Sequence, residues 1–241
     1  MNRTLGWIAV VGLSVGVVSL SLAWALGGRE DLRRAIAEER FGWHSCDGTV
    51  AVAGPERRLP WTGGDKIEVT TPVPLRLIAS GGSDVVLRGT PAAVAHLQVR
   101  GGKLFSCSRP DGPVEVALPA RALRHVRISG AGDVTLEKLD QRELEVRISG
   151  SGQIEAHGTV ERVAAHISGS GDVRLGDVAM KRLEVRISGS GSIEAGPKDE
   201  ADVTLSGAGK VRLLTRPASL HSKVSGAGRI LQPPLESADK K

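Results

Sequence analysis

Aromatic side chains are nearly absent from this 241-residue chain, because they make up only 2% of it and tyrosine does not occur. The four tryptophans are at positions 7, 24, 43 and 61, so none lies in the repeats described below. Carbohydrate-cleaving β-helical enzymes usually hold sugar rings on aromatic platforms, which these repeats lack. The core must therefore consist of Val, Ile, Leu and Ala side chains.

Cysteine is also scarce, since only Cys46 and Cys107 are present. Two cysteines without a Cys-x-x-Cys spacing argue against a cysteine zinc site and against a redox motif. In an exported chain an even pair is a candidate disulfide, and this one would close a loop of about 60 residues. Two unrelated buried thiols are the alternative.

Long runs of one charge are missing as well. The formal net charge is +5 and the sequence pI is about 9.6, but Lys and Arg alternate with Asp and Glu along the second half of the chain. This alternation is typical of solvated strand faces. No nucleic-acid partner is predicted, because a dense basic segment is absent.

The chain is rich in one motif, Ser-Gly-x-Gly, which occurs six times at spacings of 18 to 20 residues. A period this steady predicts stacked structural repeats. We expect the glycines to permit positive φ and close packing between repeats, and each serine to bond a nearby backbone group or the next serine. The turn residues are Ser129, Gly130, Gly132, Ser149, Gly150, Gly152, Ser168, Gly169, Gly171, Ser188, Gly189, Gly191, Ser206, Gly207, Gly209, Ser225, Gly226 and Gly228.

Apolar residues flank each turn with a period of two, as in a half-buried strand. The residue before the serine and the third residue before it are both apolar in five of the six repeats. After the first turn, Val134 and Leu136 begin two further columns of this kind. Each repeat is therefore predicted to be a strand, a glycine turn and a second strand.

A single strand pair is marginal in water, so the repeats must bury their apolar columns against one another. We predict an all-β fold, a single-chain β-solenoid with a repeat of about 19 residues. A plain antiparallel meander is the alternative, but it does not explain why only every second turn would be Ser-Gly-x-Gly.

Less regular strands are expected upstream of the repeats, and we expect them to form atypical rungs that also cap the stack. Residues 80–87 look like a degenerate copy of the repeat turn. The strand candidates are 66–70, 75–78, 94–99 and 114–118.

Residues 5–26 form an uncharged segment that is long enough to cross a bilayer as a helix, with Trp7 and Trp24 near the two interfaces. A cleaved signal peptide is the alternative, since Ala23-Trp24-Ala25 resembles a cleavage site, although the apolar run exceeds the usual length. The predicted organisation is a transmembrane anchor or signal peptide at 1–27 and a charged juxtamembrane spacer at 28–40. A solenoid at 41–231 follows, with regular repeats from 120, and then a disordered tail at 232–241.

The position after each Ser-Gly-x-Gly argues against a calcium array and leaves no metal or cofactor predicted. Two carboxylates, two neutral residues and two cations stacked in one column cannot form repeated calcium cages. In order, that position holds Asp133, Gln153, Asp172, Ser192, Lys210 and Arg229. No Ser-His-Asp set or other catalytic constellation is predicted in the repeats.

The strongest basic stripe is the outward column Arg127, Arg147, His166, Arg186 and Lys223. It is a candidate surface for an anionic polysaccharide or lipid head group. The favoured interpretation is structural: the column two positions earlier would partly neutralise the stripe and relieve repulsion between stacked like charges. That earlier column holds His125, Glu145, Ala164, Glu184, Asp202 and His221.

The units Arg-Ile-Ser-Gly-Ser-Gly-x-Ile and His-Ile-Ser-Gly-Ser-Gly-Asp-Val, with residues 61–69 upstream, resemble the head GIN domain family, whose members are often labelled autotransporter adhesins. The resemblance covers roughly residues 41–231. It implies an all-β, solenoid-like domain in the bacterial cell envelope, and it brings no catalytic residues to carry over.

Two indications of the orientation of the chain in the membrane disagree. Four arginines (Arg29, Arg33, Arg34 and Arg40) follow the apolar run and only Arg3 precedes it, so the positive-inside count would keep the body cytoplasmic. Large domains often translocate regardless of charge, and the resemblance implies an envelope protein. We therefore predict an inner-membrane anchor with the body in the periplasm or cell envelope; a soluble periplasmic or exported protein is the alternative.

The predicted role is non-catalytic binding, adhesion or scaffolding by a membrane-tethered envelope protein. One alternative is a binder of anionic glycan or lipid through the stripe, and another is a β-helical polysaccharide-modifying enzyme. Homo-oligomerisation through open solenoid ends is a further possibility, because exposed sheet edges pair unless they are capped. The ligand, whether glycan, lipid or protein, is not identified by the sequence.

Overall fold

The computed structural model describes residues 54–72, 74–106 and 112–234. Within these ranges no helix has the length and apolar character needed to cross a membrane. The predicted anchor at 1–27, the spacer at 28–40, the candidate disulfide Cys46–Cys107 and most of the predicted tail lie outside the described residues.

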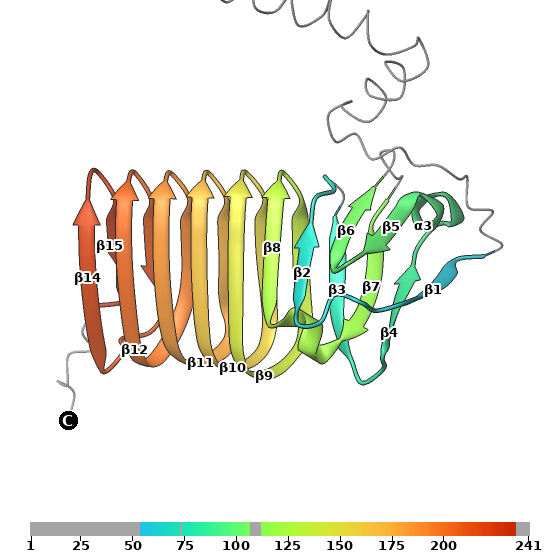
Figure 1. Ribbon diagram of the computed structural model, residues 1–241. Helices are drawn as coiled ribbons and strands as arrows, with labels where there is room; N and C mark the ends of the chain where they lie inside the picture. Colours follow the sequence, from blue (N-terminus) through green and yellow to red (C-terminus); the bar gives the residue numbers. More distant parts are fainter. Residues whose placement is uncertain (1–53, 73, 107–111, 235–241) are drawn as a thin grey trace, which may run out of the picture. The chain divides into compact units, whose positions relative to one another are not determined.

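The centre of the fold is a stack of four long parallel strands, β9 (Asp133–Gly150), β10 (Gln153–Gly169), β11 (Asp172–Gly189) and β12 (Ser192–Gly207). Each begins after one Ser-Gly-x-Gly turn and ends in the next, and it bends back on itself in between (Figure 1). The β-solenoid is confirmed. The predicted unit of a strand, a glycine turn and a second strand is confirmed, and the second strand of one unit continues through the bend into the first strand of the next with only a local register shift.

Each rung presents two strand faces. The half before each turn belongs to what we call the stripe face, made of β2, β6, β8, the second halves of β9–β12, and β14; the half after the turn belongs to the return face. Neighbouring rungs pair in register, so the six motif serines form one column along the upper edge in Figure 1. Rungs in such a ladder are about 4.8 Å apart.

The apolar columns predicted from the sequence form the core between the two faces. Val146, Ile148, Val185 and Ile187 are each no more than 2% exposed, as are their equivalents on the other inner rungs. At the last rung the pattern fails, because Ser222 replaces an apolar residue and is exposed, and Val224 is 44% exposed. The inward columns are therefore confirmed for the first five repeats only.

The two glycines of each turn are required for different reasons, as the turn of Gly189 and Gly191 illustrates. Gly189 has φ +128°, in the left-handed region where a side chain is strained. A Cβ on Gly191 would lie 2.6 Å from the carbonyl oxygen of Gly171 on the preceding rung. The turns stack too closely for any side chain at these points.

The rung before the first motif uses a different turn. β2 (Lys66–Val69) pairs with β8 (His125–Gly130), and β3 (Leu75–Ser80) pairs with β9, with Val69 opposite Ile128 and Leu75 opposite Val134. Five residues separate each of these strand pairs, so residues 70–74 (Thr-Thr-Pro-Val-Pro) occupy the place of Ser-Gly-Ala-Gly-Asp. The rung's geometry is kept without the motif.

The supposed degenerate turn at 80–87 does not form a rung, so that interpretation was wrong. It leads from β3 into β4 (Asp84–Arg88), which runs antiparallel to β1 (Glu56–Pro60) and β7 (Val114–Pro119). Antiparallel pairing ends the solenoid here and caps its first rungs.

The strand expected at 94–99 was also partly wrong. Residues Pro91–His96 form helix α3, which starts with Thr90 accepting a hydrogen bond from the Ala93 backbone N–H and has proline in its first turn. Only Leu97–Arg100 is a strand, β5, antiparallel to β6 (Lys103–Ser106). The predicted strands at 66–70, 75–78 and 114–118 are confirmed.

The order of the rungs differs from the order of the chain. The β2–β3 rung lies between two rungs that come later in the sequence, β6 and β7 on one side and β8 and β9 on the other. After β7 the chain crosses back to β8 through a 3₁₀ helix at Ala120–Leu123. Figure 1 shows β2 beside β8 for this reason. Residues far apart in sequence thus meet on the stripe face.

The other end of the stack is simpler. β12 pairs with β13 (Lys210–Leu213) on the return face and with β14 (Ser219–Ser225) on the stripe face, and β15 (Arg229–Leu231) follows β13. Within the described residues no further strand or helix covers β14 and β15. Both sheets therefore end in open edges.

Candidate functional site

The predicted basic stripe is brought together in one outward column of the stripe face. Register pairing places Arg127 beside Arg147, then His166, Arg186, Thr204 and Lys223, one residue per rung. At this spacing one rung separates neighbouring side chains by about 4.8 Å. The stripe is interrupted by one neutral residue, Thr204, before it reaches Lys223.

Ion pairs to the neighbouring column form on two of these rungs. Arg147 contacts Glu145, and Arg186 lies 2.8 Å from Glu184. These are the contacts that the neutralising interpretation requires. They lower the local positive charge in the middle of the stripe without covering it, because Arg147 and Arg186 remain more than half exposed.

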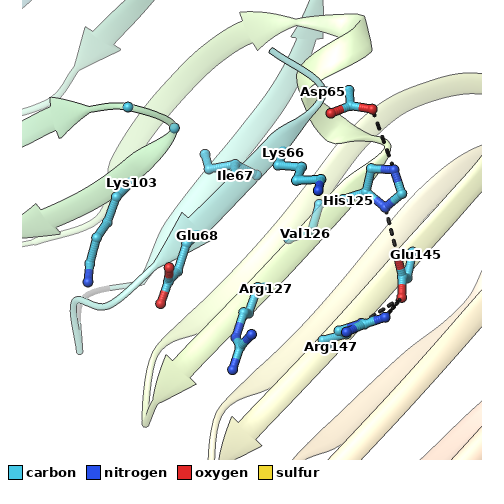
Figure 2. Close-up of a pocket in the computed structure, with 12 residues that line it drawn as sticks. Asp65, Lys66, Ile67, Glu68, Lys103, His125, Val126, Arg127, Glu145 and Arg147 are labelled. Carbon is cyan, nitrogen blue, oxygen red and sulfur yellow. Dashed lines mark hydrogen bonds and ion pairs between the residues drawn. The ribbon is translucent and has the colours of Figure 1, made fainter. Parts of the chain in front are cut away.

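The two ends of the stripe are not neutralised in this way. Arg127 and Lys223 make no ion pair or hydrogen bond with any described residue. The residue two positions before each is a histidine, His125 or His221, where the rungs of Arg147 and Arg186 have glutamate. Arg127 in particular has its guanidinium free on the surface (Figure 2).

Arg127 also belongs to an open groove of about 610 Å³ that the sequence did not reveal. In this groove the stripe column is extended by Glu68 and Lys103, since Glu68 pairs with Arg127 on one side and with Lys103 on the other. Lys66 and Lys103 have no ion-pair partner among the described residues. Three unpaired cations thus line one groove at the N-terminal end of the stripe.

A chain of four charged or ionisable groups borders this groove (Figure 2). His125 Nδ1 lies 2.7 Å from Glu145 Oε2 and His125 Nε2 lies 3.6 Å from Asp65 Oδ2, while Arg147 holds the other oxygen of Glu145. Both ring nitrogens of His125 therefore face carboxylates. This chain of contacts links the loop before β2 to β8 and β9.

The pKa of Glu145 reflects these contacts. Partial burial by itself raises the pKa, but hydrogen bonds from His125 and Arg147 outweigh it, so the pKa lies below the ordinary value for glutamate. Glu145 is thus held in its charged form.

The pKa of His166 is also lowered, and because histidine is a base this favours its neutral form. Burial is the main cause and the positive charge of Arg147 adds to it, so the pKa of His166 is lowered from its ordinary value. His166 is accordingly neutral at pH 7. The charge of the stripe then comes from Arg127, Arg147, Arg186 and Lys223.

A second groove, of about 620 Å³, runs along the stripe beside the motif serines. Arg127, Arg147, His166 and Arg186 line one side of it. Four serine hydroxyls line it as well, and within the described residues these have no hydrogen-bond partner: Ser149, Ser168, Ser188 and Ser206. The expectation that each serine bonds a backbone group or the next serine was therefore wrong; Ser129 alone among them donates, to Glu68 at 3.0 Å.

The arrangement suits binding of a long anion better than catalysis. It offers guanidinium groups and free hydroxyls at a constant spacing along two adjoining grooves. Its two histidines in contact with carboxylates, His125 and His166, have no hydroxyl partner among the described residues. Lys66, Glu68 and Lys103 were missed from the sequence because nothing in the repeat pattern shows that β2 and β6 extend this face.

A family model described as "Putative auto-transporter adhesin, head GIN domain" matches residues 56–217. A crystal structure from Bacteroides fragilis described as a putative adhesin aligns with a TM-score of 0.55 and 20% identity, over 74% of this chain and 96% of that one. At such identity the likeness shows a shared fold.

A second crystal structure, from Parabacteroides distasonis and described as a putative lipid binding protein, aligns with a TM-score of 0.43 and 16% identity, over 74% of this chain and 96% of that one. No curated protein matches this chain significantly.

Proposed function

The chain belongs to the head GIN domain family, and on that premise we propose that it is a non-catalytic binding module of the cell envelope whose ligand surface is the stripe face. The ligand in this proposal is an extended anionic glycan that lies across the rungs. Residues 5–26 tether the module to the membrane.

The observation that carries the proposal is the combination of unpaired cations with unpaired hydroxyls at rung spacing. Arg127, Lys66 and Lys103 supply three unpaired cations at one end, beside the carboxylates of Asp65, Glu68 and Glu145. Arg147 and Arg186 continue the line with charges that are paired but exposed. The free serine hydroxyls beside them can exchange hydrogen bonds with sugar hydroxyl groups.

The geometry favours a polymer over a single small anion. Each exposed charge contact on a protein surface contributes only about 0–1 kcal/mol, so useful affinity requires several rungs to be engaged at once. A linear polyuronate has one carboxylate per sugar and meets that need. In the absence of aromatic platforms, charge and hydroxyl contacts have to supply the recognition.

A matched pair of triple variants tests the proposal. Arg127→Glu, Arg147→Glu and Arg186→Glu reverse the stripe, whereas Arg76→Glu, Arg174→Glu and Arg212→Glu reverse three arginines of the return face. Each substitution changes the charge by two, so both triples take the formal net charge from +5 to −1. Retention on immobilised polygalacturonate is measured for both, with circular dichroism to check folding.

We expect the stripe triple to lose retention and the return-face triple to keep most of it. Equal loss in both would mean that only net charge matters, and unchanged retention of the stripe triple would refute the stripe as the ligand surface. Turnover of the polyuronate by the wild-type chain would contradict the non-catalytic role.

The location is tested separately through Cys46 and Cys107. We expect a membrane-impermeant thiol reagent to reach them, after reduction, without rupture of the inner membrane. Labelling only after that membrane is broken would place the body in the cytoplasm and refute the envelope assignment.

A further inference from the structure

The bend of the solenoid, on the edge opposite to the glycine turns, carries a cluster that the binding proposal does not use. Glu155 and His157 lie on β10, and Asp177 lies opposite His157 on β11. The ladder between β10 and β11 shifts register between Glu155 and His157, so this corner is a bulge. Bulges often re-aim side chains at binding sites.

The three side chains converge on the outside of the bend. His157 Nδ1 lies 3.2 Å from Asp177 Oδ2, and His157 Nε2 lies 3.6 Å from Glu155 Oε1. With one donor atom taken from each residue, all three atoms lie within 4.8 Å of one another. Among the described residues this is the one such group of three.

The neighbouring arginine does not account for the position of Glu155. Arg174 lies directly opposite Glu155 in the β10–β11 ladder, yet the two form no ion pair, and Arg174 has none with any other described residue. Glu155 contacts His157 instead. Two carboxylates thus approach one imidazole, one at each ring nitrogen.

We propose that Glu155, His157 and Asp177 bind one divalent transition-metal ion of the zinc type. One imidazole nitrogen with two carboxylate oxygens is a donor set that Zn²⁺ accepts, whereas Ca²⁺ prefers oxygen ligands alone. Ligands of a tetrahedral zinc lie about 2.0–2.2 Å from the ion and therefore about 3.3 Å from each other. Asp177 Oδ2 lies 3.2 Å from His157 Nδ1, whereas Glu155 Oε1 lies 3.6 Å from Nε2. One of the two carboxylates therefore has to turn toward the ring nitrogen that the other faces, and one donor atom from each residue already lies within 4.8 Å of the others.

The site is open to solvent and joins two rungs. The side chains of Glu155, His157 and Asp177 are 41%, 37% and 75% exposed, so small rotations complete the coordination without opening the fold. Water occupies the fourth position. Because two ligands come from β10 and one from β11, the ion cross-links neighbouring rungs and stabilises the native state by mass action.

The test is a titration of the full chain with Zn²⁺ alone, by calorimetry and by thermal unfolding, in a Cys46→Ser, Cys107→Ser background that removes the thiols as competing ligands. We expect one ion per chain and a zinc-dependent rise of the Tm. His157→Gln and Asp177→Asn should each weaken binding by more than the ~10-fold that loss of a mere supporting partner can cost. His221→Gln, which removes an exposed histidine outside the cluster, should leave it unchanged.

A folding defect in one variant would not decide the matter, because the imidazole ¹⁵N resonances of His157 in the parent protein report on the ion directly. Zn²⁺ should shift those resonances at one equivalent, and it should leave those of His221 in place. Absence of binding, or affinity that survives both His157→Gln and Asp177→Asn, would refute the site.

Discussion

The two ends of the solenoid build the same rung from different sequences. Between Ser129 and Leu231 every turn on the motif edge is Ser-Gly-x-Gly, and one rung lies directly on the next. In the β2–β3 rung, residues 70–74 replace that motif by Thr-Thr-Pro-Val-Pro in the same length. The fold therefore requires the inward apolar residues and a turn of five residues; the glycines are required where a turn packs closely on the turn of the preceding rung.

The ends also differ in how they stop the sheets. At the N-terminal end, β4 pairs antiparallel with β7 and β5 pairs antiparallel with β6, and α3 connects β4 to β5, so further parallel rungs are excluded. At the C-terminal end β14 and β15 are open, with Lys223 and Arg229 on them and Pro233-Pro234 after them. Charges and prolines on edge strands discourage pairing with other chains.

The largest effect is expected from a side chain in a stacked turn. Gly189→Val should lower the free energy of unfolding by about 4 kcal/mol or more, through strain at positive φ and overlap with the neighbouring rung. A Cβ there would lie 2.4 Å from the carbonyl oxygen of Gly169. Urea denaturation checks it, with Gly81→Val as the control, because a Cβ on Gly81 meets nothing within 4 Å. Equal stability of the two variants would contradict the stacking argument.

Core truncation should separate the capped end from the open one. Leu77→Ala, in the β2–β3 rung that lacks the motif, should lower the free energy of unfolding by about 2–5 kcal/mol, because its side chain is fully buried. Val224→Ala, in the open last rung, should cost less than about 1 kcal/mol, since that side chain is 44% exposed. Thermal and urea unfolding of both variants give the measurement. Similar costs would mean that the last rung is covered in solution.

Exchange of the turns tests whether the motif is interchangeable. Replacing Thr70-Thr71-Pro72-Val73-Pro74 by Ser-Gly-Ala-Gly-Asp should change stability by only about 1 kcal/mol. Loss of the two prolines raises the conformational entropy of the unfolded chain and so lowers the free energy of unfolding, by about 0.4–1 kcal/mol for each proline. Removal of the buried Thr71 hydroxyl, which has no hydrogen-bond partner, offsets part of this loss.

The reverse exchange, with Thr-Thr-Pro-Val-Pro at 188–192, should be far more damaging, because position 189 is closely stacked. If both exchanges are tolerated equally, stacking does not explain the glycines.

The smallest effect is expected from the contacts of Glu145 with His125 and Arg147. The pKa of Glu145 is lowered in the fold, so its contribution is present above the ordinary glutamate pKa and is lost as pH falls through the lowered value. Because the group is partly exposed and screened, we expect less than about 1 kcal/mol. The urea midpoint should fall less steeply below about pH 4.5 in Glu145→Gln than in the parent, and identical slopes would contradict the assignment.

Much of the candidate stripe was predictable, because period-two alternation and the motif spacing together place Arg127, Arg147 and Arg186 on one face and in one column. The groove at its end was not. Lys66 and Lys103 come 61 and 24 residues before Arg127 in the chain, and no periodicity relates them to it. Similarly, Thr90 and Pro91 signal the start of helix α3, but a short alternation of apolar residues led to the prediction of a strand at 94–99.

The sequence alone determined the rung, since the inward columns and the glycine turns leave few other ways to bury Val, Ile and Leu without aromatic residues. It also determined the family, and with it the solenoid. Only the tertiary structure decided which rungs are neighbours, because strand order depends on which apolar edge is covered by which later segment. The insertion of β2 between β6 and β8, the groove that results and the meeting of Glu155 and His157 with Asp177 at the bend all follow from that packing, which local sequence patterns do not encode.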